Sequence, residues 1–582
     1  MIDINKILKE KYNILPDTKL SIKYLLLTKI LKRVLFIDRL NSFIVQNSHL
    51  DAKNFINEFF DYLNFTFTIS NKDIQKIPAE GKFIIVSNHP IGSLDGLSLL
   101  KAVLDVRNDV KILANELLYS IEELRPLLIP LKLDSKSFQK TSIELILKHL
   151  GNDSPLIIFP AAEVSRLKWF TIADSKWHKG AIYFARKFNA PILPVFISAK
   201  NSILFYIVSI INKRFSIVLL PYELFNKRNK TINIKVGDLI PNKAFSSSLI
   251  NDVYQTKLLK KHVYSLGRNG KNIYLTEKNI ILPLDKKVLK DELNKSDILG
   301  ITKEDMKLIL TNKRDSPNVL SEIARLRELT FRKVGEGTGK RLDLDTFDDH
   351  YSHLVLWDDK NLEIVGSYRI GNGSNILNNK GVEGFYTSTL FTFSENFINE
   401  YIPKSIELGR SFIQKKYWNS HALNYLWQGI GAYLYNNSSI QYLFGGVSIS
   451  NSYPQSAREL IVFYFSKWFP PNNQYAISKN RMILTSAKID YYNSIFNSGT
   501  AKNDYKILKG MLKPYGFSVP ILYKHYSELC DENGIAFLDF GIDPAFENCV
   551  DGLILVNTAL IKEEKKKKFI KSFDRELNNA AI

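Results

Sequence analysis

The pattern of hydrophobic and polar positions changes twice along the chain. Residues 1–75 carry apolar side chains at helical spacing, which predicts amphipathic helices. From about residue 80 to 245, short apolar runs alternate with helical stretches, as in an α/β sheet with crossover helices. The strands expected there are 83–87, 110–113, 156–159, 192–197 and 232–236.

A second α/β pattern begins near residue 318, with strands expected at 353–357, 364–369, 405–408 and 442–448. The segment between the two patterns is rich in lysine and asparagine and only weakly periodic, so it predicts a linker or edge elements. We therefore expect an α/β protein of two domains. The expected divisions are a helical region 1–75, a first α/β domain 76–250, linker or edge elements 251–300 and a second α/β domain 301–582.

Composition limits the class of protein. A chain of 582 residues exceeds what one hydrophobic core normally supports, and 45% hydrophobic residues exclude a disordered chain. The two cysteines, Cys530 and Cys549, are too few for a disulfide framework or a four-ligand zinc site. A reducing cytosolic setting and no metal site are therefore expected.

The net charge of +20 predicts a partner of opposite sign, either nucleic acid or an anionic membrane surface. Residues 24–37 alternate lysine and arginine with bulky apolar residues, as in a helix at a lipid interface, although such a face can also cover the protein's own core. The apolar run 202–211 is too short to span a bilayer. Since no nucleic-acid motif is present, we expect a cytoplasmic protein, peripheral on the cytoplasmic face of the inner membrane.

Residues 86–97 place His89 and Asp95 in one loop between an apolar strand and a helix expected over 97–104. A histidine beside a carboxylate is the usual form of a general base and its orienting partner. The two lie six positions apart, so the loop must bend, and Pro90 and Gly92 allow that bend. An isolated pair of this kind is also compatible with an ordinary turn.

The loop resembles the glycerolipid acyltransferase family, in which Asn-His is followed by four residues and then Asp; here five residues intervene. Residues 159–166 are similar to the family's second block and keep its Glu-x-x-Arg spacing, while 177–181 and 190–197 resemble later blocks. The resemblance implies that His89 is the general base and that Asp95 orients it. It implies that Arg166 holds an acceptor phosphate or carboxylate and that Glu163 positions the acceptor or Arg166; a plain loop carboxylate is the alternative for Glu163.

A second set of charged residues lies in or beside the later strands, where an inward-facing charge must be paired or used. These residues are Asp345, Asp348, Arg369, Glu407 and Arg410. Singly, each is compatible with a structural ion pair. Their order resembles the acyl-homoserine-lactone synthases and the ornithine N-acyltransferases, which are GNAT-like, and the segments 326–339 and 426–431 are most similar to the ornithine-lipid branch.

This second resemblance implies roles for the residues. Glu407 would remove a proton from an amine, and Arg369 and Arg410 would bind substrate. Asp345 and Asp348 would bind a cationic amino-acid side chain or brace Arg369.

The resemblance also bears on the acyl donor. Gly429 and Gly431 match part of the cofactor loop, but Leu426 replaces its usual arginine or glutamine. A degraded coenzyme A site of this kind suggests an acyl carrier protein thioester as donor, with a coenzyme A thioester as the alternative and no permanently bound cofactor.

The chain as a whole resembles the fused bacterial ornithine-lipid synthases. That resemblance implies N-acylation of an amino acid, ornithine favoured, with a 3-hydroxyacyl chain by the second domain, followed by O-acylation of the lyso-aminolipid by the first. One alternative is a 1-acylglycerol-3-phosphate O-acyltransferase fused to a GNAT-like domain of separate function. Another is a basic binding module without catalysis.

Overall fold

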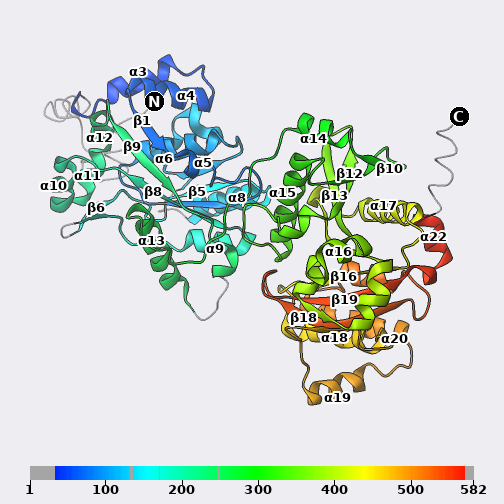
Figure 1. Cartoon of the computed structure of the whole chain (residues 1–582). Helices are drawn as coiled ribbons and strands as arrows, with labels where there is room; N and C mark the ends of the chain where they lie inside the picture. Colours follow the sequence, from blue (N-terminus) through cyan, green and yellow to red (C-terminus); the bar gives the residue numbers. More distant parts are fainter. Residues whose placement is uncertain (1–32, 132–135, 169–170, 246–249, 571–582) are drawn as a thin grey trace. The chain divides into compact units, whose positions relative to one another are not determined.

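The computed structural model describes residues 33–131, 136–168, 171–245 and 250–570 (Figure 1). The chain divides into two compact units, Met1–Leu282 and Pro283–Ile582, which we call the first and second units. Each contains a large sheet with helices packed on it, which confirms the predicted α/β class. Most of the cationic apolar stretch 24–37 lies outside the described residues.

The first unit is built on a sheet of order β1-β9-β8-β2-β5-β3-β4. All neighbouring strands are parallel except β8 and β9. The central strands are continuous apolar runs because both faces of a parallel sheet are covered. The strands are β1 Thr66–Ile69, β2 Ile84–Ser87, β3 Lys111–Ala114, β4 Leu128–Pro130, β5 Leu156–Ile158, β8 Ile192–Ser198 and β9 Thr231–Val236.

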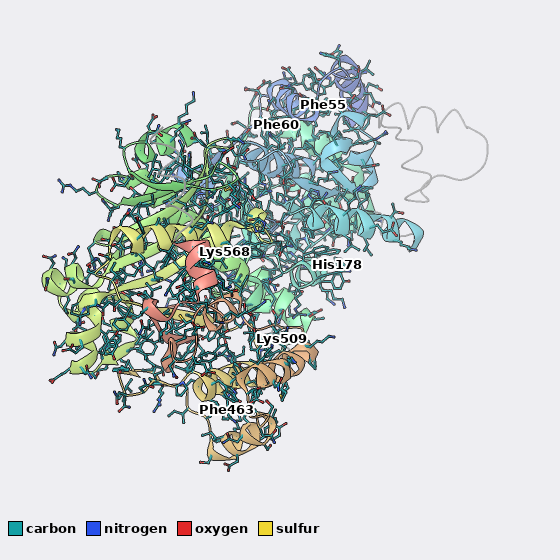
Figure 2. All side chains as sticks on the ribbon, turned by 90° about the vertical axis from the view of Figure 1, so that its right-hand side faces the viewer. Phe55, Phe60, His178, Phe463, Lys509 and Lys568 are labelled. Atoms are coloured by element: carbon teal, nitrogen blue, oxygen red, sulfur yellow. The ribbon has the colours of Figure 1, made fainter. Side chains whose placement is uncertain are left out.

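Helices cover both faces of this sheet. One face packs against α3 (Ile37–Gln46), α4 (Ala52–Tyr62) and α6 (Ser93–Leu104), and Phe55 and Phe60 of α4, labelled in Figure 2, are buried in that core. The other face packs against α8 (Lys136–Gly151), α9 (Gly180–Phe188) and α13 (Asp252–Gly267). Helix α13 falls in the segment expected to be a linker or edge elements, and its Leu259 and Val263 are part of the core.

The remaining elements of the first unit are short and lie mainly around the strand ends. They are α5 Asn71–Ile74, α7 Glu116–Tyr119, β6 Arg166–Lys168, β7 Thr171–Ala173, α10 Ile203–Ile211, α11 Lys213–Val218, α12 Leu220–Asn226 and the 3-10 helices Glu122–Leu127 and Asn242–Phe245. Strands β6 and β7 form a small antiparallel hairpin. In the described part of the chain, no helix is long and apolar enough to cross a membrane.

The second unit is built on a sheet of order β10-β11-β12-β13-β15-β16-β19-β18. Neighbouring strands of this sheet are antiparallel except β15 and β16, which run parallel. These two strands pair only over a short stretch, in which residues 405–407 of β15 lie opposite residues 442–444 of β16. Beyond that point the two strands no longer pair, although both continue. The strands are β10 Asp297–Ile301, β11 Lys307–Asn312, β12 Ser352–Asp358, β13 Glu363–Asn372, β15 Ser405–Ile413, β16 Tyr442–Ile449, β18 Ile535–Asp543 and β19 Cys549–Asn557.

Alternate side chains of these strands pack against helices on opposite faces of the sheet. One face carries α17 (Ala422–Asn436), α18 (Gln455–Trp468) and α20 (Ala501–Leu512). The other carries α14 (Lys286–Leu293), α15 (Pro317–Val334) and α16 (Gly373–Lys380). The smaller elements include α19 Ser486–Ile495, α21 Ile521–Ser527, α22 Glu563–Phe569 and the strand pair β14 Phe391–Phe393 with β17 Ala476–Ser478.

Candidate active sites

The loop after β2 brings His89 and Asp95 together. Nδ1 of His89 lies 3.0 Å from Oδ1 of Asp95. Asn88 fixes the start of the loop, because its amide donates to the Ile197 carbonyl (2.9 Å) and accepts from the Ile197 N–H (2.8 Å) on β8. The histidine loop is therefore attached to two neighbouring strands of the sheet.

Asp95 is fixed by the helix that follows it. Helix α6 begins at Ser93, four residues earlier than expected, so Asp95 lies in its first turn. Its Oδ2 accepts from the N–H groups of Ile91 (2.8 Å) and Gly92 (3.2 Å). Gly92 has φ +100°, a conformation that side-chain-bearing residues rarely adopt, and this bend accommodates the five intervening residues.

Electrostatics favour a protonated His89. Burial lowers the pKa of this imidazole, but the negative charge of Asp95, its hydrogen bonding and the charge of Asp174 outweigh that effect, so the pKa lies above its usual value. The ring packs on Phe159 at 4.4 Å between centroids and remains 20% exposed. Nε2 has no hydrogen bond to any residue the structure describes, so it is available to a substrate hydroxyl.

Asp174 is a functional neighbour that sequence reasoning missed. Its buried carboxylate accepts from the His89 N–H (3.2 Å), the Ser165 hydroxyl (2.5 Å) and Nε1 of Trp177 (2.8 Å). It thus ties the histidine loop to the second sequence block. Only its position three residues before Trp177, in a block already singled out, could have pointed to it.

Arg166 lies beside the histidine loop, because Ser165 donates its N–H to the His89 carbonyl at 2.7 Å. Its Nη1 donates to the hydroxyls of Ser209 (2.5 Å) and Ser216 (2.7 Å). Nε and Nη2 are buried and have no hydrogen-bond partner among the described residues. A guanidinium that is 11% exposed and keeps two N–H groups open is suited to receive an anion.

Glu163 balances the charge at this site. Its Oε2 lies 2.7 Å from Nζ of Lys213 and 3.6 Å from Nε of Arg166. Burial raises the pKa of Glu163, but the Lys213 ammonium and hydrogen bonding outweigh this and hold the pKa below its usual value. Glu163 is therefore ionised at neutral pH and helps to orient Arg166.

In the second unit, the predicted acidic and basic residues form one buried cluster. Arg369 Nη1 lies 2.7 Å from Asp345 Oδ1 and 3.4 Å from Asp348 Oδ1, and Arg410 Nη2 lies 3.6 Å from Asp345 Oδ2. Arg327, which sequence reasoning missed, donates to both oxygens of Asp348 at 3.0 and 2.9 Å. The two aspartates therefore brace arginines, which was one of the two alternatives.

Glu407 is already occupied by the protein itself. Its carboxylate accepts from the Tyr351 hydroxyl, from the Tyr386 N–H (3.2 Å) and from the Thr387 N–H (2.8 Å). The side chain is buried. This geometry holds the turn at 385–387 in place and does not favour the proton-accepting role expected for Glu407.

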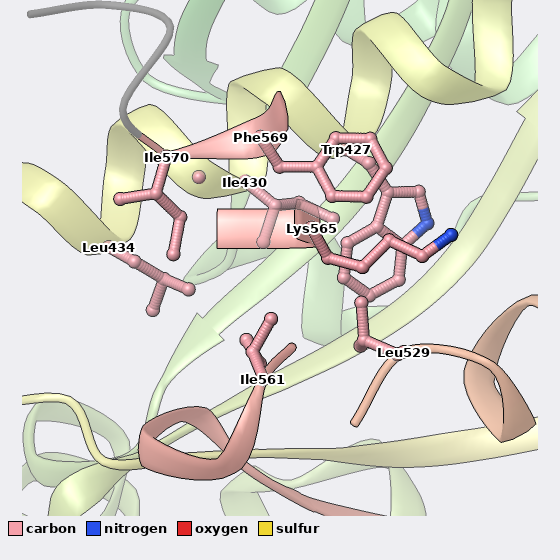
Figure 3. Close-up of a pocket in the computed structure, with 9 residues that line it drawn as sticks. Trp427, Ile430, Leu434, Leu529, Ile561, Lys565, Phe569 and Ile570 are labelled. Atoms are coloured by element: carbon pink, nitrogen blue, oxygen red, sulfur yellow. The ribbon is translucent and has the colours of Figure 1, made fainter. Parts of the chain in front are cut away.

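Gly429 and Gly431 are not at a helix N-terminus, contrary to the expected cofactor loop. Helix α17 begins at Ala422, so both glycines lie in its middle, where their N–H groups are used within the helix. A Cβ at Gly429 would meet Leu354 at 2.7 Å, and one at Gly431 would clash with the Phe569 carbonyl oxygen. Figure 3 shows Phe569 and Ile570 against this helix, so the glycines allow close packing.

The end of α22 also anchors to α17 through a polar contact. Nζ of Lys568, labelled in Figure 2, donates to the Asn424 side chain at 3.1 Å. Helix α22 is therefore lysine-rich and exposed along most of its length, and its buried residue is Phe569.

Comparison with known proteins matches the two halves of the chain to two kinds of acyltransferase. A family model described as "Acyltransferase" matches residues 17–270, and one described as "Acetyltransferase (GNAT) domain" matches residues 326–428. The glycine N(alpha)-acyltransferase of Phocaeicola vulgatus is 32% identical over 306 residues, which cover 50% of this chain and 93% of that protein. The lyso-glycine lipid O-acyltransferase of Bacteroides thetaiotaomicron is 30% identical over 260 residues, covering 43% and 91%. The chain belongs to the aminolipid acyltransferases.

This aminolipid acyltransferase joins the two kinds of enzyme in one chain, which confirms the fused architecture predicted from the two motif sets. A further relative, the L-ornithine N(alpha)-acyltransferase of Brucella abortus, is 29% identical over 154 residues, which cover 24% of this chain and 52% of that protein.

Proposed function

We propose that the second unit joins a 3-hydroxyacyl chain to the α-amine of an amino acid, and that the first unit then acylates the new hydroxyl. The observation that carries this order is the open fork of Arg166 beside His89. An N-acylated amino acid presents a carboxylate to Arg166 and a hydroxyl to His89 in one molecule. The product is a phosphorus-free lipid with two chains.

Glycine is the amino acid that we propose. The relative named for glycine matches over 93% of its length, whereas the relative named for ornithine matches over 52%. In addition, Asp345 and Asp348 are paired with Arg369 and Arg327, so this pair offers no free carboxylate to a cationic side chain. This shifts the expected substrate from ornithine to glycine.

The O-acylation step follows from the His89 geometry. His89 Nε2 takes the proton from the substrate hydroxyl as its oxygen attacks the thioester carbonyl, and Asp95 stabilises the imidazolium at Nδ1. The C–S bond then breaks, and the imidazolium returns the proton to the leaving thiolate. No proton is gained or lost overall.

Acyl carrier protein is the donor that we propose. In the second unit, the glycines expected to contact a cofactor pyrophosphate are buried in the middle of α17. The chain's net charge of +20 also attracts an acidic carrier protein. Turnover with acyl carrier protein thioesters should exceed turnover with coenzyme A thioesters of the same chain, and equal rates would contradict the proposal.

Isotope labelling of lipids tests the whole pathway. The enzyme is expressed in a host that lacks aminolipids, which is fed ¹⁵N-glycine or ¹⁵N-ornithine, and its lipids are analysed by mass spectrometry. A phosphorus-free diacyl lipid labelled from glycine is expected. A lipid labelled from ornithine instead would show that ornithine, and not glycine, is the amino-acid substrate. New phosphatidic acid without any aminolipid would favour the 1-acylglycerol-3-phosphate alternative.

Replacing Arg166 by methionine should weaken acceptor binding. A charge-assisted hydrogen bond contributes about 1.5–3 kcal/mol, so we expect the KM for the lyso-lipid to rise about 10- to 100-fold with little change in kcat. Steady-state kinetics with synthetic N-(3-hydroxyacyl)glycine measure this. Arg228→Met, at an exposed arginine of the same unit, is the matched control, and an unchanged KM in Arg166→Met would contradict the role.

A peripheral position on the membrane is supported by α10. Its face Ile203, Leu204, Ile207, Ile210 and Ile211 is exposed, with Ile211 78% accessible. Exposed lysines at 200 and 213 flank the helix and suit anionic headgroups. We propose that this face enters the lipid interface of the cytoplasmic leaflet.

Introducing glutamates on this face should release the protein from lipid. We expect the double variant Ile207→Glu/Ile210→Glu to bind vesicles containing phosphatidylglycerol at least about tenfold more weakly, since each buried isoleucine contributes about 1.5–3 kcal/mol. Co-sedimentation measures binding. Ile483→Glu, at an 81% exposed isoleucine of the second unit, should bind like the wild type. If the double variant binds vesicles as well as the wild type, the face does not bind lipid. If the wild type is a dimer and the double variant is a monomer, the face binds a second copy of the chain.

A further inference from the structure

The second unit contains open space where β15 and β16 stop pairing. The last paired residues are Glu407 and Phe444. Arg410 has φ +48° next to a register shift between β13 and β15, and this bulge re-aims β15. A Cβ built at Gly409 would have no neighbour within 4 Å, and one at Gly446 would meet only the carboxyl carbon of Asp551, at 4.0 Å.

Asp551 borders this space from β19. It lies opposite Ser448 in the β16–β19 register, and its Oδ1 accepts from the Ser448 hydroxyl at 2.5 Å. The side chain is buried. Because Ser448 holds it, Asp551 is a fixed negative charge at the edge of the space.

Glu336 is brought to the same region by the loop after α15. Its N–H donates to the Phe331 carbonyl at 2.9 Å, and Ser450, two residues beyond Ser448, donates its hydroxyl to the Val334 carbonyl at 2.6 Å. The Glu336 carboxyl forms no hydrogen bond or ion pair with the described residues, and the charges that act on it are Asp551 and Arg410.

This availability separates Glu336 from the three carboxylates that the sequence motifs singled out in this unit. Glu407 accepts three hydrogen bonds, and Asp345 and Asp348 are paired with arginines. Arg410, whose guanidinium stacks between the rings of Tyr386 (4.8 Å) and Phe546 (4.7 Å), has a buried Nε that lies 3.7 Å from Asp343 Oδ2 and makes no hydrogen bond with the described residues. A free carboxyl and an arginine beside unfilled space suit an amino acid, which carries an ammonium and a carboxylate.

We propose that Glu336 is the catalytic base of N-acylation and that it removes a proton from the α-ammonium of the amino acid, with Asp551 as a positioning residue. This rests on the N-acylation proposed above. The neutral amine then attacks the thioester carbonyl, the C–N bond forms and the C–S bond breaks. One of the two remaining nitrogen protons passes to the thiolate, and Glu336 later releases its proton to solvent.

Electrostatics support this assignment. Burial, together with the charge of Asp551, raises the pKa of Glu336 to about 8, although Arg410 lowers it. A base with a pKa near the working pH is effective toward an ammonium. The pKa of Asp551 is itself raised to about 6, chiefly by burial and by Asp543, while Ser448, Cys549 and Arg410 lower it.

Glu336→Gln tests the base directly. With purified full-length enzyme, glycine and an acyl carrier protein thioester, we expect kcat for N-acylation to fall about 10²- to 10⁴-fold. The KM for the donor should change little, and O-acylation of synthetic lyso-lipid by the first unit should be unaffected. Glu532→Gln, at an exposed glutamate of the same unit, is the matched control.

Asp551→Asn supplies a readout that a purely structural role would not move. Removing this negative charge should lower the pKa of Glu336, so the acidic limb of the kcat profile should shift to lower pH. If the wild type is active, either of two results would overturn the assignment of the base and leave the N-acylation reaction standing. One is a fully active Glu336→Gln variant, and the other is loss of the acidic limb of the kcat profile in Glu407→Gln instead. A wild type that acylates no amino acid would overturn both.

Discussion

His89→Ala should abolish the second acylation and leave the first intact. Loss of a positioned general base costs about 10²- to 10⁴-fold in rate, and no other imidazole in the described part of the first unit lies against Asp95. Cells that express the variant should accumulate the single-chain N-acyl amino acid in place of the two-chain lipid. Mass spectrometry of lipid extracts measures the ratio of the two species.

The pH dependence of O-acylation gives this prediction a second readout. Since the pKa of His89 lies above its usual value, its basic form predominates only above that pKa, and the rate should rise with pH through this range. Asp95→Asn should move the limb to lower pH and slow the reaction. His178→Ala, at an exposed histidine of the same unit, should leave the lipid ratio unchanged. Two-chain lipid at wild-type levels in His89→Ala would show that another group is the base.

Asp348→Asn should have the largest effect on stability. The change leaves Arg327 and Arg369 buried without this carboxylate, and breaking a buried ion pair costs about 3–5 kcal/mol. We expect the second unit to unfold several degrees lower and N-acylation to fall with it. Thermal unfolding followed by circular dichroism measures the shift. Asp349→Asn, the neighbouring exposed carboxylate paired with Lys313, should cost about 1 kcal/mol or less.

The free energy of unfolding should depend on pH differently in the wild type and in Asp348→Asn. Burial raises the pKa of Asp348, but Arg327 and Arg369 outweigh it and hold the pKa well below its usual value. A carboxylate with a depressed pKa in the folded state contributes its full stability above an unfolded-state pKa of about 4 and loses it as the pH falls further. The variant should therefore lose less stability between about pH 5 and pH 3 than the wild type. Equal losses would mean that Asp348 is not held by its arginines.

Sequence reasoning succeeded where the determinants are local. His89 and Asp95 belong to one strand–loop–helix segment, so their pairing follows from the bend at Gly92. Nine strands of the two large sheets were predictable because each contains a short apolar run, whereas β1, β4, β10, β11, β18 and β19 were not expected. The start of α6 was placed four residues late, since Asp95 acts as part of the helix's first turn through bonds to Ile91 and Gly92.

The roles that depend on distant segments could not be predicted from the sequence. Glu407 matched a base by motif, yet it accepts from Tyr351 and from the backbone at 386–387, which no spacing rule connects to it. Gly429 and Gly431 matched a phosphate loop, yet α17 begins at Ala422 and the end of α22 closes over Gly431. Glu336 lies in the segment 326–339, but the resemblance of that segment implied no role for it, and only the fold brings it near Asp551.

In the arrangement proposed above, helix α10 links the bilayer to the acceptor site. Ser209, which holds Arg166, lies on the side of the helix opposite Ile207. A helix is about 10 Å across, so with its apolar face in the interface Arg166 would lie at roughly the depth of a lipid headgroup. The lyso-lipid could then be captured with its chain still in the leaflet. Product of the second unit would reach the first by diffusing in two dimensions, without a passage through water.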